Sequence, residues 1–295
     1  MVADLPEFVT NGSKNAKMVS YADDSTLYVR SKDLSTLKSD LERLSENMIS
    51  YCKQSGLIIN SDKTQLLIST KDKLDVKVGS SLITAAPEIS LLGIEYDSNF
   101  TTQPYLQKLA REASTRSSLI YRLSFSTPPH FLSTLANGML MGKVLSSAAA
   151  AIPIKIREDD KTYLFVEDIN KAIKATALTI TKTKLVDKVR SCVVLQRAGL
   201  RCLNEMVASI MARMIWKSRH AMDPLGRLLF PEKCPIKFTR SYYSDDATRP
   251  VPGYPLIAAN IMVRIWNTVP GLKSATSLGI ASSISQNWAK SIPTE

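Results

Sequence analysis

The chain has few of the residues on which compact metal sites and histidine-based catalysis depend. Among its 295 residues are two histidines, His130 and His220, and four cysteines without any Cys-x-x-Cys pair. This spacing favours ordinary buried thiols in a reducing compartment over a zinc cluster, although His220 leaves a dispersed zinc site as the alternative. Neither histidine has the setting of a hydrolase base, and we expect both to be structural or surface residues. The cysteines are Cys52, Cys192, Cys202 and Cys234.

Long hydrophobic runs are absent as well. No apolar stretch reaches the ~18 residues of a membrane span, and the opening residues lack the basic-then-apolar pattern of a secretion signal. With 44% hydrophobic residues, 11 glycines and 14 prolines, the composition is not that of a disordered tail. We therefore expect a folded intracellular protein, nuclear and/or cytoplasmic, with one large domain or two smaller ones.

Charge divides the chain into two parts. Residues 1–100 carry 11 Lys and Arg against 14 Asp and Glu, a net charge of −3. Residues 101–295 carry 27 against 13, a net charge of +14. A strongly basic second part indicates a polyanionic partner, with scattered solubilising charge as the alternative interpretation.

The first hundred residues combine strand and helix patterns. Residues 16–30 predict a β-hairpin around a polar centre, and 74–84 predict another around Gly79-Ser80. Residues 64–69 and 89–96 predict single strands. Leucines and other apolar residues recur at helical spacing over 34–53. These patterns predict an α+β layer in which a helix packs on a sheet.

From residue 101 onward the pattern is mainly helical. Apolar residues recur at helical spacing in the segment that contains Leu106, Ile120 and Leu123, and again over 163–184. Ser191 and Asn204 are candidate N-caps for helices near 192–198 and 205–221. Prolines between 224 and 255 predict loops. Residues 130–150 are rich in Leu, Met and Ala, and we expect short final elements over 257–268 and 277–291.

The sharpest feature is a pair of adjacent carboxylates, Asp23 and Asp24, at the first hairpin turn. Hard divalent cations take oxygen ligands, so such a pair is suited to hold Mg²⁺ for phosphoryl transfer. An isolated Asp-Asp is more often a plain turn. Here it belongs to Tyr21-Ala22-Asp23-Asp24, a tetrapeptide that chance rarely places in a chain of this length.

Tyr-Ala-Asp-Asp in a hairpin resembles the signature of the reverse transcriptase palm, and neighbouring motifs resemble the LINE-type, jockey-like branch of non-LTR retrotransposons. The resemblance is dense over residues 3–97 and thin beyond. It implies a partial polymerase palm over 1–100 (an antiparallel sheet with a packed helix), a thumb-like helical region over 101–160 and a mainly helical C-terminal region over 161–295. The further matching segments are Ala3-Asp4-Leu5-Pro6, Gly56-Leu57-Ile58-Ile59-Asn60-Ser61-Asp62-Lys63-Thr64, Leu91-Leu92-Gly93-Ile94 with Asp97, and Ile265-Trp266-Asn267-Thr268-Val269-Pro270.

The resemblance assigns roles by position. Asp23 is expected as a catalytic Mg²⁺ ligand, with Asp24 as its partner carboxylate. Tyr21 is expected near the primer end, and Lys63 near the triphosphate, where a cation steadies the departing pyrophosphate. Leu92 and Gly93 are expected to grip the primer, with ordinary strand residues as the alternative.

The basic second part fits a thumb. Lys108, Arg111, Arg116 and Arg122 are expected to contact phosphates of an RNA template paired with a DNA primer, or else to form a solvated face. Trp216 and Trp266 fit the core better than base stacking. Deoxynucleoside triphosphates would be substrates of the complete enzyme, and the oligomeric state is not indicated.

Only 20 residues precede Tyr21, so the family's first catalytic aspartate and its template grip have no counterpart in this sequence. We therefore expect the chain to be inactive alone, as a truncated gene model, a decayed element or a fragment. The main alternative is a non-catalytic basic nucleic-acid-binding protein derived from a retroelement. A pseudogene product without a selected role and an unrelated α+β protein remain further alternatives.

Overall fold

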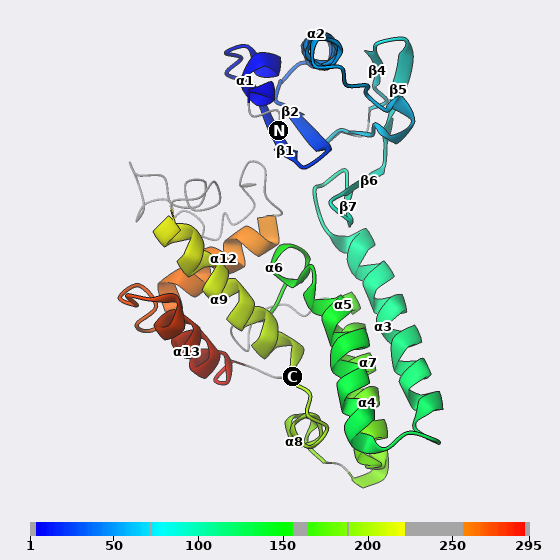
Figure 1. Cartoon of the computed structure of the whole chain (residues 1–295), viewed down its shortest axis with the longest axis vertical. Coiled ribbons are helices and arrows are strands. Elements are labelled where there is room, and N and C mark those ends of the chain that lie inside the picture. The colour runs from blue at the N-terminus through cyan, green and yellow to red at the C-terminus, as the bar shows by residue number, and fades with distance from the viewer. Residues whose placement is uncertain (1–3, 71, 156–163, 188, 222–255, 293–295) are drawn as a thin grey trace. The chain divides into compact units, whose positions relative to one another are not determined.

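The computed structural model describes residues 4–70, 72–155, 164–187, 189–221 and 256–292. The chain divides into two compact units, Met1–Phe100 (unit 1) and Thr101–Glu295 (unit 2). Unit 1 combines helices with small sheets, and the described part of unit 2 is helical (Figure 1). The fold is therefore mixed α+β, and the boundary between the units falls where the net charge changes from −3 to +14.

Helix α2 (Leu34–Gln54) is the longest element of unit 1 and confirms the helix predicted over 34–53. Asp33 caps it: the Asp33 carboxylate accepts hydrogen bonds from the backbone N–H of Thr36 at 2.8 Å and from its hydroxyl at 2.7 Å. The other helices of unit 1 are α1 (Leu5–Thr10) and the 3-10 turn η1 (Ser61–Lys63).

The apolar stripe of α2 serves two separate clusters, one along each half of the helix. Leu44 and Tyr51, in the C-terminal half, are buried together with Val9 of α1 and Met18 of the first hairpin. Leu34, Leu37 and Leu41, in the N-terminal half, pack against a second buried cluster, which consists of Ile68, Leu74 and Val76. One helix thus contributes apolar side chains to both clusters of unit 1.

Two predicted hairpins are confirmed. Strands β1 (Ala16–Tyr21) and β2 (Asp24–Val29) pair antiparallel with Tyr21 opposite Asp24. Strands β4 (Asp75–Val78) and β5 (Ser81–Ala86) pair antiparallel with Val78 opposite Ser81, which leaves Gly79-Ser80 as the turn. Gly79 has φ 64°, a conformation that costs glycine little.

The expectation of one antiparallel sheet is wrong. Three small sheets form in the described residues: β1-β2, β3-β5-β4 and β6-β7. Strand β3 is only Leu66–Leu67 and pairs parallel with β5, so it is shorter than the strand predicted over 64–69.

The single strand predicted over 89–96 is also wrong. The segment forms a hairpin of β6 (Glu88–Leu91) and β7 (Ile94–Asp97). Its two-residue turn has φ 50° at Leu92 and φ 79° at Gly93. Positive φ at both central residues matches the right-handed twist of paired strands and reverses the chain sharply.

The described part of unit 2 is helical, as the mainly helical pattern from residue 101 onward predicted. The segments expected over 163–184, 257–268 and 277–291 appear as α7, α12 and α13. The described helices are α3 (Gln103–Leu123), α4 (Pro129–Leu135), the π segment η2 (Ala136–Met141), α5 (Gly142–Leu145), α6 (Ala148–Ala151), α7 (Leu164–Thr181), η3 (Leu185–Asp187), α8 (Ser191–Arg197), α9 (Leu203–Ala221), α12 (Leu256–Thr268) and α13 (Leu278–Ala289). None of these helices is long and apolar enough to cross a membrane.

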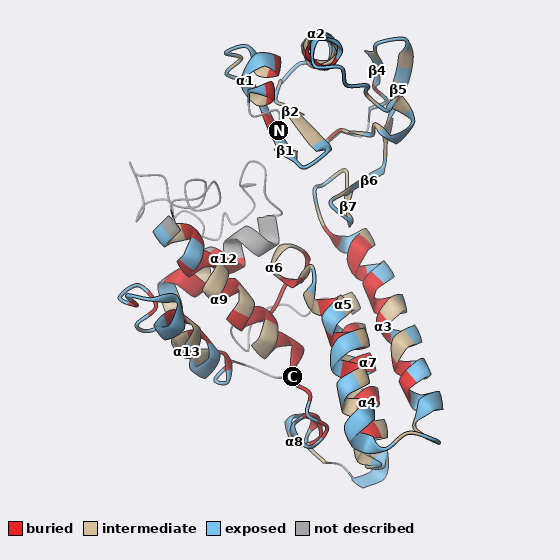
Figure 2. Ribbon diagram, in the orientation of Figure 1, coloured by how far each residue is buried: buried red, intermediate tan, exposed pale blue. Residues whose placement is uncertain are grey.

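Helices α3 and α7 pack against each other along their length, and a buried hydrogen bond joins the hydroxyls of Thr176 and Ser117 at 2.9 Å. Figure 2 shows α3 with buried residues on one side and exposed residues on the other. Leu106 and Ile120 lie in the core as the stripe predicted, whereas Leu123 is 40% exposed. Residue 160, the expected thumb boundary, falls inside unit 2.

Several smaller expectations differ from the structure. Ser191 is the first residue of α8 and Asn204 lies inside α9, so neither is an N-cap. Cys52 and Cys202 are buried as expected, but Cys192 is exposed. Cys234 and the loops predicted between 224 and 255 lie outside the described residues.

Trp216 and Trp266, both expected in the core, are buried. Ile265 and Val269, which flank Trp266 in the same motif, are buried as well. Trp216 donates an indole hydrogen bond to the carbonyl oxygen of Ala275 at 3.1 Å, and Trp266 is 9% exposed. His220 stacks on Trp216, with ring centroids 4.1 Å apart. Both tryptophans therefore serve packing, in line with their apolar surroundings.

Leu44→Ala should destabilise unit 1 by about 2–5 kcal/mol, because it removes a fully buried side chain from the point where α1, α2 and the first hairpin meet. Leu82→Ala, at a 64% exposed position of the same unit, is the matched control and should change stability by less than about 0.5 kcal/mol. Amide hydrogen exchange of α2 in the complete chain measures both. Equal protection in the two variants would contradict this packing.

The Asp33 cap should give α2 a pH-dependent stability. Hydrogen bonds from the Ser35 hydroxyl, then from the Thr36 backbone and hydroxyl, lower the pKa of Asp33 from 3.8 to about 2. Because the folded state favours the charged carboxylate, the stabilisation is complete above about pH 4. It is lost as the pH falls from 3.8 towards 2.

Asp33→Asn keeps a capping side chain that does not titrate. Hydrogen exchange of the first turn of α2 should therefore lose protection over this pH window in the wild type by more than in Asp33→Asn. The same acid response in both proteins would rule out the cap as its source.

Candidate active-site hairpin

The two aspartates lie at the turn of the β1–β2 hairpin, which is a tight two-residue connection. Ala22 and Asp23 form the turn, and Asp24 begins β2 opposite Tyr21. Ala22 has φ 53°, the left-handed region that glycine usually occupies at this position of a type II′ turn. For an L-residue this conformation costs about 1–2 kcal/mol, so the surrounding hairpin must hold it in place.

The hairpin has one face on the core and one face outward. Ala16 and Met18 of β1 are buried, whereas Val19 and Tyr21 are each 69% exposed. Since directly opposite residues share a face, Asp24 lies on the outward face with Tyr21. Asp23 occupies the turn itself, and both carboxylates are exposed.

A serine pair closes the inward face just before the turn. The Ser20 and Ser25 hydroxyl oxygens lie 3.0 Å apart across the two strands. This cross-strand hydrogen bond joins the strands one residue from the aspartates, so it limits how far the turn can open. In the described residues the hairpin pairs with no third strand, and both of its edges are open.

The donor set at this turn fits one hard cation incompletely. Two carboxylates provide the oxygen ligands that Mg²⁺ prefers, and water would have to fill the rest of its octahedral shell. A two-metal site needs more: within the described ranges, no group of three or more Asp, Glu, His or Cys side chains converges to hold a metal ion. The hairpin therefore offers part of a metal site.

The base of the hairpin is anchored through α1 and α2. The Tyr51 hydroxyl donates a hydrogen bond to the Asp4 carboxylate at 2.5 Å, which lowers the pKa of Asp4 and raises that of Tyr51. The Asn47 amide donates to the carbonyl oxygen of Val9 at 3.1 Å. Asp4 belongs to one of the matching motifs, and here it fastens α1 to the helix that carries the hairpin.

Lys63, Leu92 and Gly93 lie on elements other than the aspartate hairpin. Lys63 ends η1, where its backbone N–H lies 3.3 Å from the Asn60 side-chain oxygen, and its own side chain is exposed. Leu92 and Gly93 form the exposed turn of β6–β7. The structure thus brings together Tyr21, Asp23 and Asp24, and it places the other three on two further turns of unit 1.

The basic candidates of α3 fall into two environments. Lys108 and Arg111 are exposed and lie on one stripe with Thr115, Ser118 and Arg122, at alternating steps of three and four residues. Arg116 lies off this stripe and is half-buried. Its guanidinium donates to the carbonyl oxygen of Met139 in η2 at 2.7 Å, so it also has a role inside unit 2.

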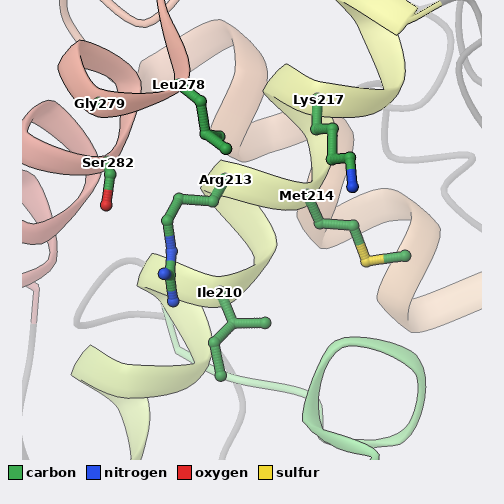
Figure 3. Close-up of a pocket in the computed structure, with 7 residues that line it drawn as sticks. All are labelled: Ile210, Arg213, Met214, Lys217, Leu278, Gly279 and Ser282. Atoms are coloured by element: carbon green, nitrogen blue, oxygen red, sulfur yellow. The ribbon is translucent and has the colours of Figure 1, made fainter.

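The structure also shows features that the periodicity did not reveal. Tyr121 and Phe125 are 55% and 78% exposed at the end of α3, with ring centroids 5.3 Å apart in an edge-to-face arrangement. A cleft lies between α9 and α13, with Arg213 and Lys217 among its lining residues (Figure 3). Exposed aromatics at a helix end leave no periodic signal, and the cleft depends on the pairing of distant helices.

The comparisons with known proteins do not identify a family. No protein-family model, no curated protein and no solved structure matches this chain. Any functional assignment therefore depends on the residues of the hairpin, on the motifs around it and on the distribution of charge.

Proposed function

We propose that this chain is the C-terminal palm-and-thumb portion of an RNA-directed DNA polymerase of a non-LTR retrotransposon. The observation that carries the proposal is the position of Tyr21-Ala22-Asp23-Asp24 at a tight hairpin turn, with α2 packed behind it. Polymerase chemistry needs carboxylates displayed on a rigid support and open to nucleic acid. A plain solvent-exposed turn would not need a strained Ala22 or a helix anchoring the strands.

In this proposal each residue of unit 1 has a chemical task. Asp23 and Asp24 hold Mg²⁺, which in the complete enzyme stabilises charge on the attacking and leaving oxygens. Tyr21, on the same outward face as Asp24, contacts the primer end. The exposed Lys63 supplies positive charge for the departing pyrophosphate. The backbone of the Leu92-Gly93 turn approaches the primer, where the missing Cβ of Gly93 leaves room.

The proposal also predicts that the catalytic site of this chain lacks one aspartate. Nucleotidyl transfer in the reverse transcriptases that the motifs resemble requires a third aspartate, and unit 1 displays two at the hairpin. The open edges of β1 and β2 leave room for a further strand that would bring it. We therefore expect the 295-residue chain alone to bind template and primer without extending them.

Unit 2 is suited to hold the duplex. The stripe on α3 combines three cations with two small hydroxyl side chains and extends about 21 Å from Lys108 to Arg122 at the usual helical rise. The helix's acidic residue, Glu112, lies off the stripe and pairs with Lys143 at 3.3 Å. Such a face neutralises phosphates without reading sequence.

A second function, non-catalytic nucleic-acid binding, is favoured by the same basic unit. The net charge of +14 in residues 101–295 attracts any polyanion. The exposed rings of Tyr121 and Phe125, beside Arg122, offer a surface on which unpaired bases can stack. In this alternative the hairpin aspartates have no part in binding.

The two functions can be separated with a recessed poly(rA)–oligo(dT) primer–template. We expect no incorporation of dTTP by the chain above the level of Asp23→Ala, but measurable binding of the primer–template. If the aspartates hold Mg²⁺ at the primer end, Mg²⁺ should raise the affinity of the wild type for a recessed end and not that of Asp23→Ala/Asp24→Ala. Binding by fluorescence anisotropy at fixed ionic strength measures this.

Each contrary outcome has a distinct meaning. Primer extension that disappears in Asp23→Ala would show a working catalytic site. It would overturn the prediction that the chain alone cannot extend a primer. A Mg²⁺ response that is the same in the wild type and in the double variant would favour the non-catalytic alternative, since Mg²⁺ then acts only by screening phosphates. Absence of nucleic-acid binding would exclude both functions.

A further inference from the structure

An open cleft lies between helices α9 and α13, and hydrogen bonds fix the backbone on its α13 side. The Trp216 indole of α9 holds the Ala275 carbonyl oxygen at 3.1 Å, which ties down the segment that leads into α13. The Ser277 hydroxyl then caps α13 by accepting from the backbone N–H of Ile280 at 3.3 Å. The cleft between the helices has a volume of about 510 Å³, within the range of small-ligand sites.

The cleft combines an apolar surface with two cations. Ile210, Met214 and Leu278 supply the apolar part, with the Leu278 side chain directed toward α9 (Figure 3). Arg213 and Lys217 lie one turn apart on α9 and belong to the same lining. Such a lining suits a ligand that has both an apolar part and an anionic part.

The positive charge of the cleft is not neutralised from within. None of the described residues that line it is acidic, and no ion pair involving Arg213 or Lys217 occurs in the described part of the chain. The Nε–H of Arg213 donates to the Ser209 carbonyl oxygen at 3.3 Å, which leaves the terminal nitrogens of the guanidinium for a ligand.

We infer that this cleft binds one nucleotide of a single-stranded polynucleotide. The base lies on the surface made by Met214, Ile210 and Leu278. Arg213 and Lys217 point to different sides of α9 (Figure 3), so they contact the phosphates before and after this nucleotide. A base within a duplex is covered by its neighbours and cannot present its face to this surface, so the strand must be unpaired. Two cations that point apart match successive phosphates of a strand, whereas a free mononucleotide carries its phosphates at one end only.

The wider charge of unit 2 favours a strand over a free nucleotide. A net charge of +14 in residues 101–295 attracts a chain of phosphates to the unit. The inference shares a nucleic-acid partner with the proposed function, but it does not depend on the hairpin aspartates. The cleft can therefore be tested apart from polymerase activity.

The test uses a fluorescein-labelled oligo(dT) of about twelve nucleotides, titrated with the complete chain. Arg213→Ala/Lys217→Ala should weaken binding about tenfold or more, since two charge-assisted contacts are lost. Gly279→Trp should weaken it as well by filling the cleft without changing the charge. A Cβ at position 279 meets nothing closer than the Ser277 hydroxyl at 3.9 Å, so the backbone accepts the substitution.

Two control variants match these changes. Lys182→Ala/Lys184→Ala removes two exposed positive charges of unit 2 outside the cleft and should weaken binding by less than about threefold. Gly279→Ala adds only the Cβ and should bind the oligonucleotide as the wild type does. Circular dichroism of each variant verifies that the helices have formed.

The outcomes separate this inference from the proposed function. Wild-type affinity in both Arg213→Ala/Lys217→Ala and Gly279→Trp would show that the cleft does not bind the oligonucleotide. The proposed primer–template binding would not be affected by this result. Equal weakening in the two charge variants, with Gly279→Trp unaffected, would show diffuse attraction and no site. Displacement of the oligonucleotide by an equal concentration of free dTMP would replace the strand by a mononucleotide as the occupant.

Discussion

Burial of the apolar stripe of α2 is the interaction on which unit 1 depends. Leu44 and Tyr51 secure the first hairpin and α1 to one half of the helix, while Leu34, Leu37 and Leu41 secure the second cluster to the other half. The three sheets of the unit are small and separate. Short sheets of this kind are marginal in isolation, so the positions of the β1–β2 and β3–β5–β4 sheets follow from packing on the helix. The rigidity of the aspartate turn therefore depends on how firmly the first hairpin packs against α2.

Charge separates the tasks of the two units. Unit 1 is slightly acidic and displays its two adjacent carboxylates at an exposed turn, whereas unit 2 carries the excess of cations. A metal-binding turn gains from acidic groups, because they hold a divalent cation. A surface that holds nucleic acid gains from cations that release bound counterions. The proposed palm and thumb therefore differ in charge in the direction that their chemistry requires.

Elements defined by local spacing were predictable from the sequence, and those defined by distant contacts were not. The α2 helix and the Tyr21–Asp24 hairpin follow from periodicity and alternation. The turn at Leu92 was missed because leucine gives no local signal for a positive φ. The contact between Arg116 and Met139 depends on two helices that meet only in the fold. The cleft of Arg213 and Leu278 was hidden for the same reason, since these residues lie far apart in the sequence.

The most direct test of the account is whether the aspartate turn binds a divalent cation. Manganese(II) takes the same oxygen ligands as Mg²⁺ and broadens nearby amide signals in NMR spectra of the complete chain. The account predicts that the amides of Tyr21 to Asp24 broaden first and that Asp23→Ala/Asp24→Ala abolishes the effect. Broadening that begins elsewhere, for example at the exposed carboxylates of Asp72 and Asp75, or that persists unchanged in the double variant, would contradict the assignment of the hairpin as a metal site.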